Sequence, residues 1–108
     1  LESTEIKAVQ SALDLAEAAT ESGETGSLRR LAQETPNDPQ IKYDLALALY
    51  GDGLTEDSVD TLVDLVKSHQ NWNDEAARTQ LLKIFDALGH ADSITVEGRR
   101  KLSAVLFS

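Results

Sequence analysis

Residues 55–69 read TEDSVDTLVDLVKSH. The apolar side chains of this segment stand at Val59, Leu62, Val63 and Val66, which is the i, i+3, i+4, i+7 spacing of one face of an α-helix. Asp and Thr fill most of the positions between them. The segment is therefore predicted to be an amphipathic helix whose apolar face packs against neighbouring helices.

Five further apolar stripes with helical spacing flank this segment along the 108-residue chain. Ala, Leu and acidic residues dominate, and aromatic residues make up only 5% of the chain, so the composition favours helix over strand. The stripes predict an all-α protein with six helices, over residues 3–22, 26–34, 38–51, 55–69, 73–88 and 92–106.

Start and stop signals stand at the expected ends of these helices. Residues that favour helix N-termini open four of the segments, at Asn37-Asp38-Pro39, Thr55-Glu56-Asp57, Asn73-Asp74-Glu75 and Asp92-Ser93. A glycine follows three of the stripes and predicts a left-handed residue at the helix end, at Gly23, Gly53 and Gly89. Helices joined by such short turns pack as antiparallel neighbours.

An internal repeat with an offset of 36 residues links two parts of the chain. A unit of helix, glycine turn and helix with this length is close to the 34-residue tetratricopeptide repeat. We expect tetratricopeptide-like antiparallel hairpins, with about six helices stacked in a short right-handed superhelix and a single domain over residues 1–108. The matched pairs are Asp38 and Asp74, Lys42 and Arg78, Leu45 and Leu81, Leu49 and Phe85, and Gly53 and Gly89.

The repeat pattern is followed closely at some positions and departs at others. Leu45-Ala46 supplies the large and small residues expected in the first helix of a unit, and Ser58 supplies the small residue of the second helix. The first-helix aromatic, Tyr43, stands one place late, and the usual closing proline is absent after Ser68.

The charge and composition exclude several classes of function. The chain carries 10 Lys+Arg and 19 Asp+Glu, a net charge of −9, which argues against nucleic acid and anionic membranes as ligands. It has no cysteine, and therefore no disulfide or thiol chemistry of its own. No apolar run approaches the ~20 residues of a membrane span, so we expect a soluble chain without a signal peptide. Its start at Leu1 leads us to expect a piece of a longer protein.

A set of short segments in the last three-quarters of the chain carries a more specific resemblance. The segments are Pro36-Asn37-Asp38-Pro39, Tyr43-Asp44-Leu45-Ala46-Leu47-Ala48, Trp72-Asn73-Asp74, Ala77-Arg78, Gln80-Leu81-Leu82-Lys83-Ile84-Phe85 and Glu97-Gly98-Arg99-Arg100 with Leu102-Ser103. In order and gaps they resemble the C-terminal region of the YbbN-type thioredoxin-like co-chaperones, also called chaperedoxins. One departure is Asp92-Ser93, where that family commonly has Asp-Pro.

The resemblance implies a bacterial, cytoplasmic holdase that protects unfolded clients under oxidative stress. Such a protein passes its clients to a chaperonin or an Hsp70-type chaperone. It also implies an N-terminal thioredoxin-like domain, which this chain does not contain, because it has no cysteine and no strand-rich half. We therefore expect the C-terminal repeat module of a co-chaperone, non-enzymatic and without a cofactor, that contacts protein partners.

The basic run Arg99-Arg100-Lys101 and the apolar end Leu106-Phe107 form the first candidate site. One interpretation is structural. The cations are favoured near the C-terminal end of the helix by its dipole, and the apolar residues belong to the core. The other is an apolar and basic tip that binds a partner groove, and the resemblance implies that this end contacts the chaperonin. Arg99, Arg100, Leu106 and Phe107 are therefore candidate partner-binding residues.

Lys42 and Arg78 occupy equivalent repeat positions and form a second candidate, a pair of cations that binds a partner carboxylate. A full clamp for a C-terminal carboxylate needs further Lys and Asn on the inner face of the first helices. This chain has Tyr43, Leu47 and Thr79 there, which argues against such a clamp. Six acids stand without a base between Tyr43 and Val66, either as a solvated face or as a patch for a basic partner: Asp44, Asp52, Glu56, Asp57, Asp60 and Asp64.

The remaining candidates favour structural roles. Trp72 precedes a helix start and is expected to pack at a repeat interface, with an exposed partner anchor as the alternative. His69 and His90 have no ligand-spaced companions, so no metal site is predicted. Gly51-Asp52-Gly53 matches part of a phosphate-loop pattern, but the third glycine of that pattern is missing and no strand precedes the segment. It therefore indicates a helix end.

Three classes of function remain open at this point. The first is an interaction module that binds a chaperone or client through surface complementarity. The second is a structural unit that pairs, as a weak homodimer, through exposed repeat faces. The third is a small helical enzyme, although no motif in the sequence indicates a catalytic site. The resemblance favours the first.

Overall fold

The computed structural model describes residues 21–107 and shows five α-helices and no strand within them. In chain order they are α2 (Gly23–Glu34), α3 (Pro39–Gly51), α4 (Thr55–Ser68), α5 (Ala76–Leu88) and α6 (Ser93–Leu106). The helix expected over residues 3–22 lies, except for its last two residues, outside the described residues. The all-α fold of stacked helix hairpins is confirmed.

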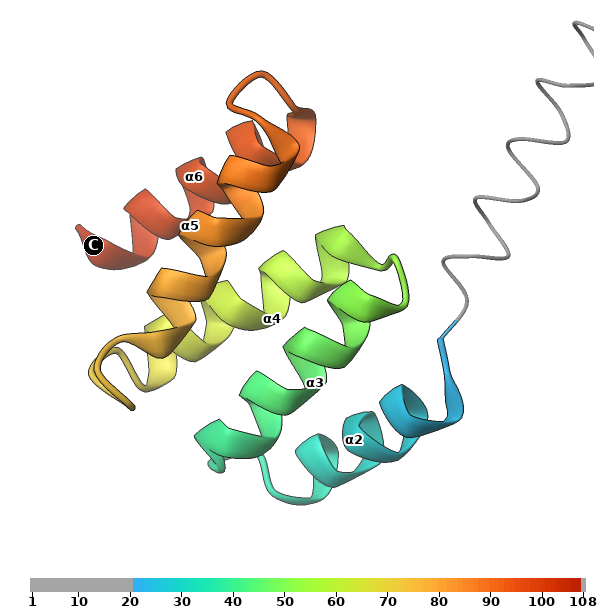
Figure 1. The fold of residues 1–108 in the computed structure, drawn as a ribbon. Helices are drawn as coiled ribbons and strands as arrows, with labels where there is room; N and C mark the ends of the chain where they lie inside the picture. The colour runs from blue at the N-terminus through green and yellow to red at the C-terminus, as the bar shows by residue number, and fades with distance from the viewer. Residues whose placement is uncertain (1–20, 108) are drawn as a thin grey trace, which may run out of the picture.

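Helix α4 lies in the middle of the stack (Figure 1). It packs against α3 on one side and against both α5 and α6 on the other, while α2 packs against α3. The α3–α4 and α5–α6 hairpins are therefore successive units of one layered stack.

The central position of α4 explains its composition. Besides the predicted stripe, Leu65 is also fully buried, because partners on two sides of the helix widen the buried face. Each such side chain contributes roughly 1.5–3 kcal/mol on burial. The core cluster is made by Ala46, Val59, Leu62, Val63, Leu65, Val66, Ala77, Leu81, Ile84, Phe85 and Leu102.

The 36-residue repeat is visible in the structure. Leu49 and Phe85 are both fully buried, and Gly53 and Gly89 end their helices with positive φ angles of 84° and 92°. At the predicted small position, the Ser58 hydroxyl donates a hydrogen bond of 2.7 Å to the carbonyl of Ala46. A larger side chain there would hold α3 and α4 apart.

At Gly98, helix α6 lies close to α5 and α4. A Cβ atom on this residue would lie 2.6 Å from Cε1 of Phe85 and 3.0 Å from Cγ1 of Val59. The first distance is shorter than real Cβ contacts, so only glycine fits without displacement of the Phe85 ring or of α6.

Two of the four predicted helix caps are confirmed. Asp38 accepts hydrogen bonds from the backbone N–H groups of Gln40 and Ile41, and Pro39 follows it as the first helical residue. Asp92 accepts a bond of 2.8 Å from the N–H of Ile94. Both caps depend only on residues close in sequence, which is why the pattern identified them.

The other start signals were wrong in detail. Helix α5 begins at Ala76, and Asn73, Asp74 and Glu75 form a left-handed turn with φ angles of 50°, 54° and 61°, without a side-chain cap. Helix α4 begins at Thr55 with Glu56 and Asp57 in its first turn, as expected, but Leu54 precedes it and no side chain caps it. Gly23 starts α2, where it was expected to end a helix. The left-handed backbone of Asn73, Asp74 and Glu75 differs from the extended backbone of an N-cap residue, so Asn73 and Asp74 do not cap α5.

Candidate functional site

The C-terminal turn of α6 separates its two apolar candidates. Leu106 is half-buried and packs against the core cluster together with Val105. Phe107 follows the last helical residue and leaves 84% of its surface exposed, the largest fraction among the large apolar side chains of residues 21–107. Of the two predicted tip residues, only Phe107 is fully available to a partner.

The three basic residues of α6 have different surroundings. The guanidinium carbon of Arg99 lies 5.9 Å from the centroid of the Phe85 ring, a cation–π distance. Arg100 pairs with Glu97 on its own helix at 2.9 Å, and 65% of its side chain is exposed. A partner can therefore reach Arg100 by competing with a weak, solvated ion pair.

Lys101 has a structural role. Its Nζ lies 2.7 Å from Oδ1 of Asp60 and joins α6 to α4. The hydrogen bond to Asp60 and the charges of Asp60, Glu56 and Glu97 raise the pKa of Lys101, against a smaller opposing effect of desolvation. Lys101 therefore links α6 to α4 through a partly exposed ion pair.

Lys42 and Arg78 lie in dissimilar environments despite their equivalent repeat positions. Nζ of Lys42 lies 2.9 Å from Asp64 on α4, and only 17% of the lysine side chain is exposed. Arg78 pairs with Glu75, 3.5 Å away in the preceding turn, and is 47% exposed. Each cation is thus paired with a different acid, Lys42 with Asp64 and Arg78 with Glu75.

Several of the acids between Tyr43 and Val66 have partners in the folded chain. Asp60 and Asp64 pair with lysines from outside that segment, and Asp52 accepts hydrogen bonds from residues near the start of α2. Glu56 and Asp57 stand in the first turn of α4, where they complement the helix dipole. Most of this acidity is thus accounted for by structural roles.

Trp72 packs at the junction of the two hairpins, in the α4–α5 loop. Its ring centroid lies 5.5 Å from that of Tyr43, with the ring planes tilted by 56°. Both rings are half-buried against the core cluster. Tyr43 and Trp72 therefore connect the start of α3 to the loop before α5.

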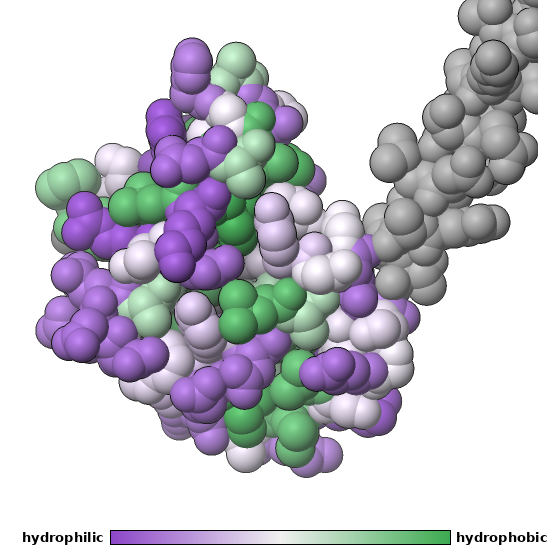
Figure 2. Space-filling view, viewed as in Figure 1, coloured by the Kyte–Doolittle hydropathy of each residue, from purple (hydrophilic) through white to green (hydrophobic). Residues whose placement is uncertain are grey.

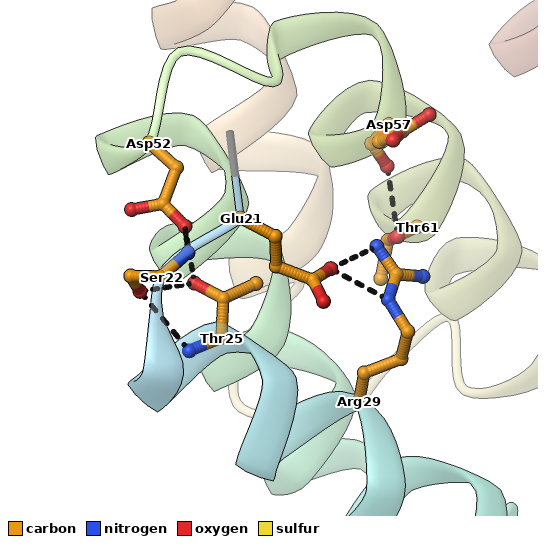
Figure 3. A network of polar contacts seen from close by, with 7 residues as sticks. All are labelled: Glu21, Ser22, Thr25, Arg29, Asp52, Asp57 and Thr61. Carbon is orange, nitrogen blue, oxygen red and sulfur yellow. Dashed lines mark hydrogen bonds and ion pairs between the residues drawn. The ribbon is translucent and has the colours of Figure 1, made fainter. Parts of the chain in front are cut away.

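A polar network that the sequence did not reveal joins the start of α2 to the end of α3 (Figure 3). Oδ2 of Asp52 accepts a hydrogen bond of 2.8 Å from the backbone N–H of Ser22 and one of 2.6 Å from the hydroxyl of Thr25. The hydroxyl of Ser22 lies 3.0 Å from that of Thr25, whose side chain is fully buried. These donors lower the pKa of Asp52, the backbone N–H of Ser22 most of all.

Beside this network, a groove of about 510 Å³ runs between α2 and α3. Apolar atoms of Leu28, Leu47 and Ala48 line it together with three acids, Glu24, Asp44 and Asp52. Exposed hydrophobic side chains are visible on this part of the molecule, at the lower end of the view in Figure 2. No sequence pattern indicates this groove, because its two walls come from different helices.

Residues 21–107 contain no group of three or more His, Cys, Asp or Glu side chains that is arranged to hold a metal ion. None of the helices in this part of the chain is both long and apolar enough to cross a membrane.

Comparison with known proteins places these helices in a family. Residues 17–107 match the family model of the tetratricopeptide repeat. Neither the curated proteins nor the solved structures include a match to the chain. Tetratricopeptide repeats generally mediate protein–protein interactions and are typically non-catalytic. The match covers most of the chain and agrees with the stacked hairpins around α4, and the chain therefore belongs to the tetratricopeptide-repeat family.

Proposed function

We propose that this chain is the partner-binding module of a thioredoxin-like co-chaperone of the YbbN type, and that it contacts a chaperonin or Hsp70-type chaperone through the C-terminal tip of α6. The tip consists of Arg99, Arg100, Leu106 and Phe107. The observation that carries the proposal is the exposure of Phe107, 84% of whose surface faces solvent at the end of α6. Leu102, Val105 and Leu106 of the same helix pack in or against the core, and Val96 near its start is the other exposed large apolar residue of α6.

An exposed phenylalanine is a strong anchor for a partner. Burial of a ring of this size in an apolar pocket contributes roughly 1.5–3 kcal/mol. Phe107 is held close to the core because Leu106, its neighbour, is packed there, so little additional order is needed on binding.

Two cations on the same helix, about two turns before Phe107, add selectivity. Arg100 is the more exposed end of a surface ion pair, and Arg99 lies over the Phe85 ring. In a chain with a net charge of −9, these two cations offer a local attraction to an acidic rim around an apolar pocket. Lys42 and Arg78, by contrast, support a carboxylate-binding pair only if their present acidic partners are displaced.

The finer identity rests on the resemblance of the segments from Leu28 to Phe107. Under this proposal residues 1–108 form one module of a longer cytoplasmic protein. Its thioredoxin-like domain and any redox activity lie outside this chain, and the whole protein holds unfolded clients during oxidative stress. The module itself carries out no chemical step and needs no cofactor.

Co-elution with a bacterial chaperonin tests the tip directly. Phe107→Ser removes the exposed ring without touching a core residue, and Leu82→Ser removes an apolar side chain that is 44% exposed on α5. We expect co-elution to be lost with the first variant and kept with the second. Retention of the chaperonin by Phe107→Ser would contradict the proposed tip.

Light scattering of the same samples covers the alternative of self-association. A dilution-resistant dimer that Phe107→Ser dissociates would show that the tip pairs two copies of the chain, and the co-chaperone proposal would then fail. A monomer for wild type and both variants is the expected result.

A further inference from the structure

The groove between α2 and α3 has an apolar floor that no described element covers. Leu47 is 40% exposed and lies beside Leu28 and Ala48, which come from the two facing helices. Leu31 on α2 is 43% exposed and Tyr50 on α3 is 38% exposed, but neither of them lines the groove. The apolar part of the groove therefore consists of Leu28, Leu47 and Ala48.

The rim of the groove is uniformly acidic. Glu24, Asp44 and Asp52 line it, and none of the described lining residues is basic. Asp52 is held as an anion, because the N–H of Ser22 and the hydroxyl of Thr25 lower its pKa. Only its Oδ2 atom is used in those two bonds. The negative charge beside the apolar floor is therefore a fixed property of the fold.

Two adjacent helices with an apolar floor between them form the kind of groove in which a third amphipathic helix lies. An acidic rim attracts a ligand with Lys or Arg on both sides of its apolar stripe and repels one with acids there. The complementary occupant is therefore a cationic amphipathic segment.

The chain's own N-terminal residues do not have this chemistry. Residues 1–20 include an apolar stripe, but they carry four acids, Glu2, Glu5, Asp14 and Glu17, and one base, Lys7. Their charge has the same sign as the rim, so charge complementarity points to another protein as the occupant.

We propose that the groove between α2 and α3 binds a cationic amphipathic helix of a partner protein, with apolar side chains on Leu28, Leu47 and Ala48 and basic side chains facing Glu24 and Asp44. This surface is separate from the tip of α6, because α3 and α4 lie between α2 and α6 (Figure 1). The chain then presents two binding surfaces at different ends of the stack.

Fluorescence anisotropy with a labelled synthetic helix tests the groove. The probe is a peptide of about four helical turns with Leu at i, i+3, i+4 and i+7 and Lys at the flanking positions, titrated with the full chain. The same peptide with Glu in place of Lys is the charge control. We expect the Lys peptide to bind with an affinity that falls as salt is raised, and the Glu peptide not to bind.

Variants of the groove and matched variants elsewhere locate the binding. We expect Leu47→Ser, and separately the double variant Glu24→Gln with Asp44→Asn, to weaken the Lys peptide about tenfold. The matched controls are Leu82→Ser and Asp86→Asn, both exposed on α5, and they should bind as wild type. Circular dichroism confirms that each variant is folded, and the rim variant keeps the groove's apolar floor intact.

Several results would overturn the proposal. Equal binding of the Glu peptide, or full affinity in the rim variant, would show that charge complementarity is not involved. Displacement of the Lys peptide by a peptide of residues 1–20 would make the chain's own segment the occupant. Release of the Lys peptide when the chain associates with itself would assign the groove to a second copy of the chain. Phe107→Ser should leave probe binding unchanged, so failure at the groove and failure at the tip are distinguishable.

Discussion

Gly98 is the residue at which a single methyl group has the largest predicted effect. A Cβ atom at this position would overlap the Phe85 ring and touch Val59, both in the core. Gly98→Ala should therefore lower the free energy of unfolding by about 1–3 kcal/mol, although alanine favours helix. Gly51→Ala is the control, since no atom lies within 4 Å of its added Cβ. Urea denaturation measures both, and a Gly98→Ala protein as stable as Gly51→Ala would show that α6 is farther from α5 than described.

Removal of two buried hydroxyl groups should have opposite effects on stability. Oγ1 of Thr95 is fully buried without a hydrogen-bond partner among the described residues, whereas Ser58 donates to the carbonyl of Ala46. Thr95→Val should stabilise the protein by about 1 kcal/mol, because it removes an unsatisfied polar atom. Ser58→Ala should destabilise it by a similar amount, because it removes a satisfied one. Thermal unfolding of the pair checks the contrast, and a loss of stability in Thr95→Val would imply a hydrogen-bond partner.

Single residues were predictable from sequence where their role is local. Asp38 and Asp92 cap helices through bonds to N–H groups two or three residues later, so the pattern alone identifies them. Asp74 has the same repeat position as Asp38, but it lies in a left-handed turn. Its conformation depends on how the loop with Trp72 packs on Tyr43, which no local pattern contains.

At the scale of elements, the ionised carboxylate of Asp52 contributes to the attachment of α2 through its bonds to Ser22 and Thr25. Its pKa is lower in the folded protein than the ordinary aspartate value of about 3.9, because Ser22 and Thr25 donate to the carboxylate. The group therefore adds stability at pH values above its unfolded pKa, and this contribution is lost as pH falls through the folded pKa.

Asp52→Asn should accordingly lower the urea midpoint at pH 7, and the difference from wild type should shrink below about pH 4. Asp86→Asn, an exposed position on α5, is the control for removal of one surface charge. A difference between Asp52→Asn and wild type that stays constant from pH 7 to pH 3 would show that the charge of Asp52 does not help to hold α2.

The order and number of helices between residues 21 and 107 followed from periodicity, but their ends did not always do so. Gly53 and Gly89 end α3 and α5 as expected, because a positive φ angle favours glycine wherever it occurs. Helix α2 begins at Gly23, three residues before the expected start. There Ser22 caps the helix and Thr25 bonds to Asp52, which is 27 positions away in sequence. Distant partners of this kind leave no periodic signal.

For the whole molecule, the repeat offset of 36 residues was the most informative signal. It predicted hairpins of the tetratricopeptide type, and both the stacked helices and the family match agree with it. The surfaces were less predictable. Phe107 was a candidate because it follows the last predicted stripe and because the resemblance implies that this end contacts a chaperonin. The groove, by contrast, needs the side-by-side placement of α2 and α3, and the partners of Lys42 and Lys101 lie on α4.

The proposed contact between the tip of α6 and a chaperonin can be tested on the unmodified chain. Hydrogen–deuterium exchange of the full chain, measured with and without a bacterial chaperonin, maps that contact without a mutation. Amides of the last two turns of α6, residues 100–107, should exchange more slowly in the complex, while those of α5 (Ala76–Leu88) keep their rates. Unchanged exchange over residues 100–107, with the chaperonin in excess, would contradict the proposed contact.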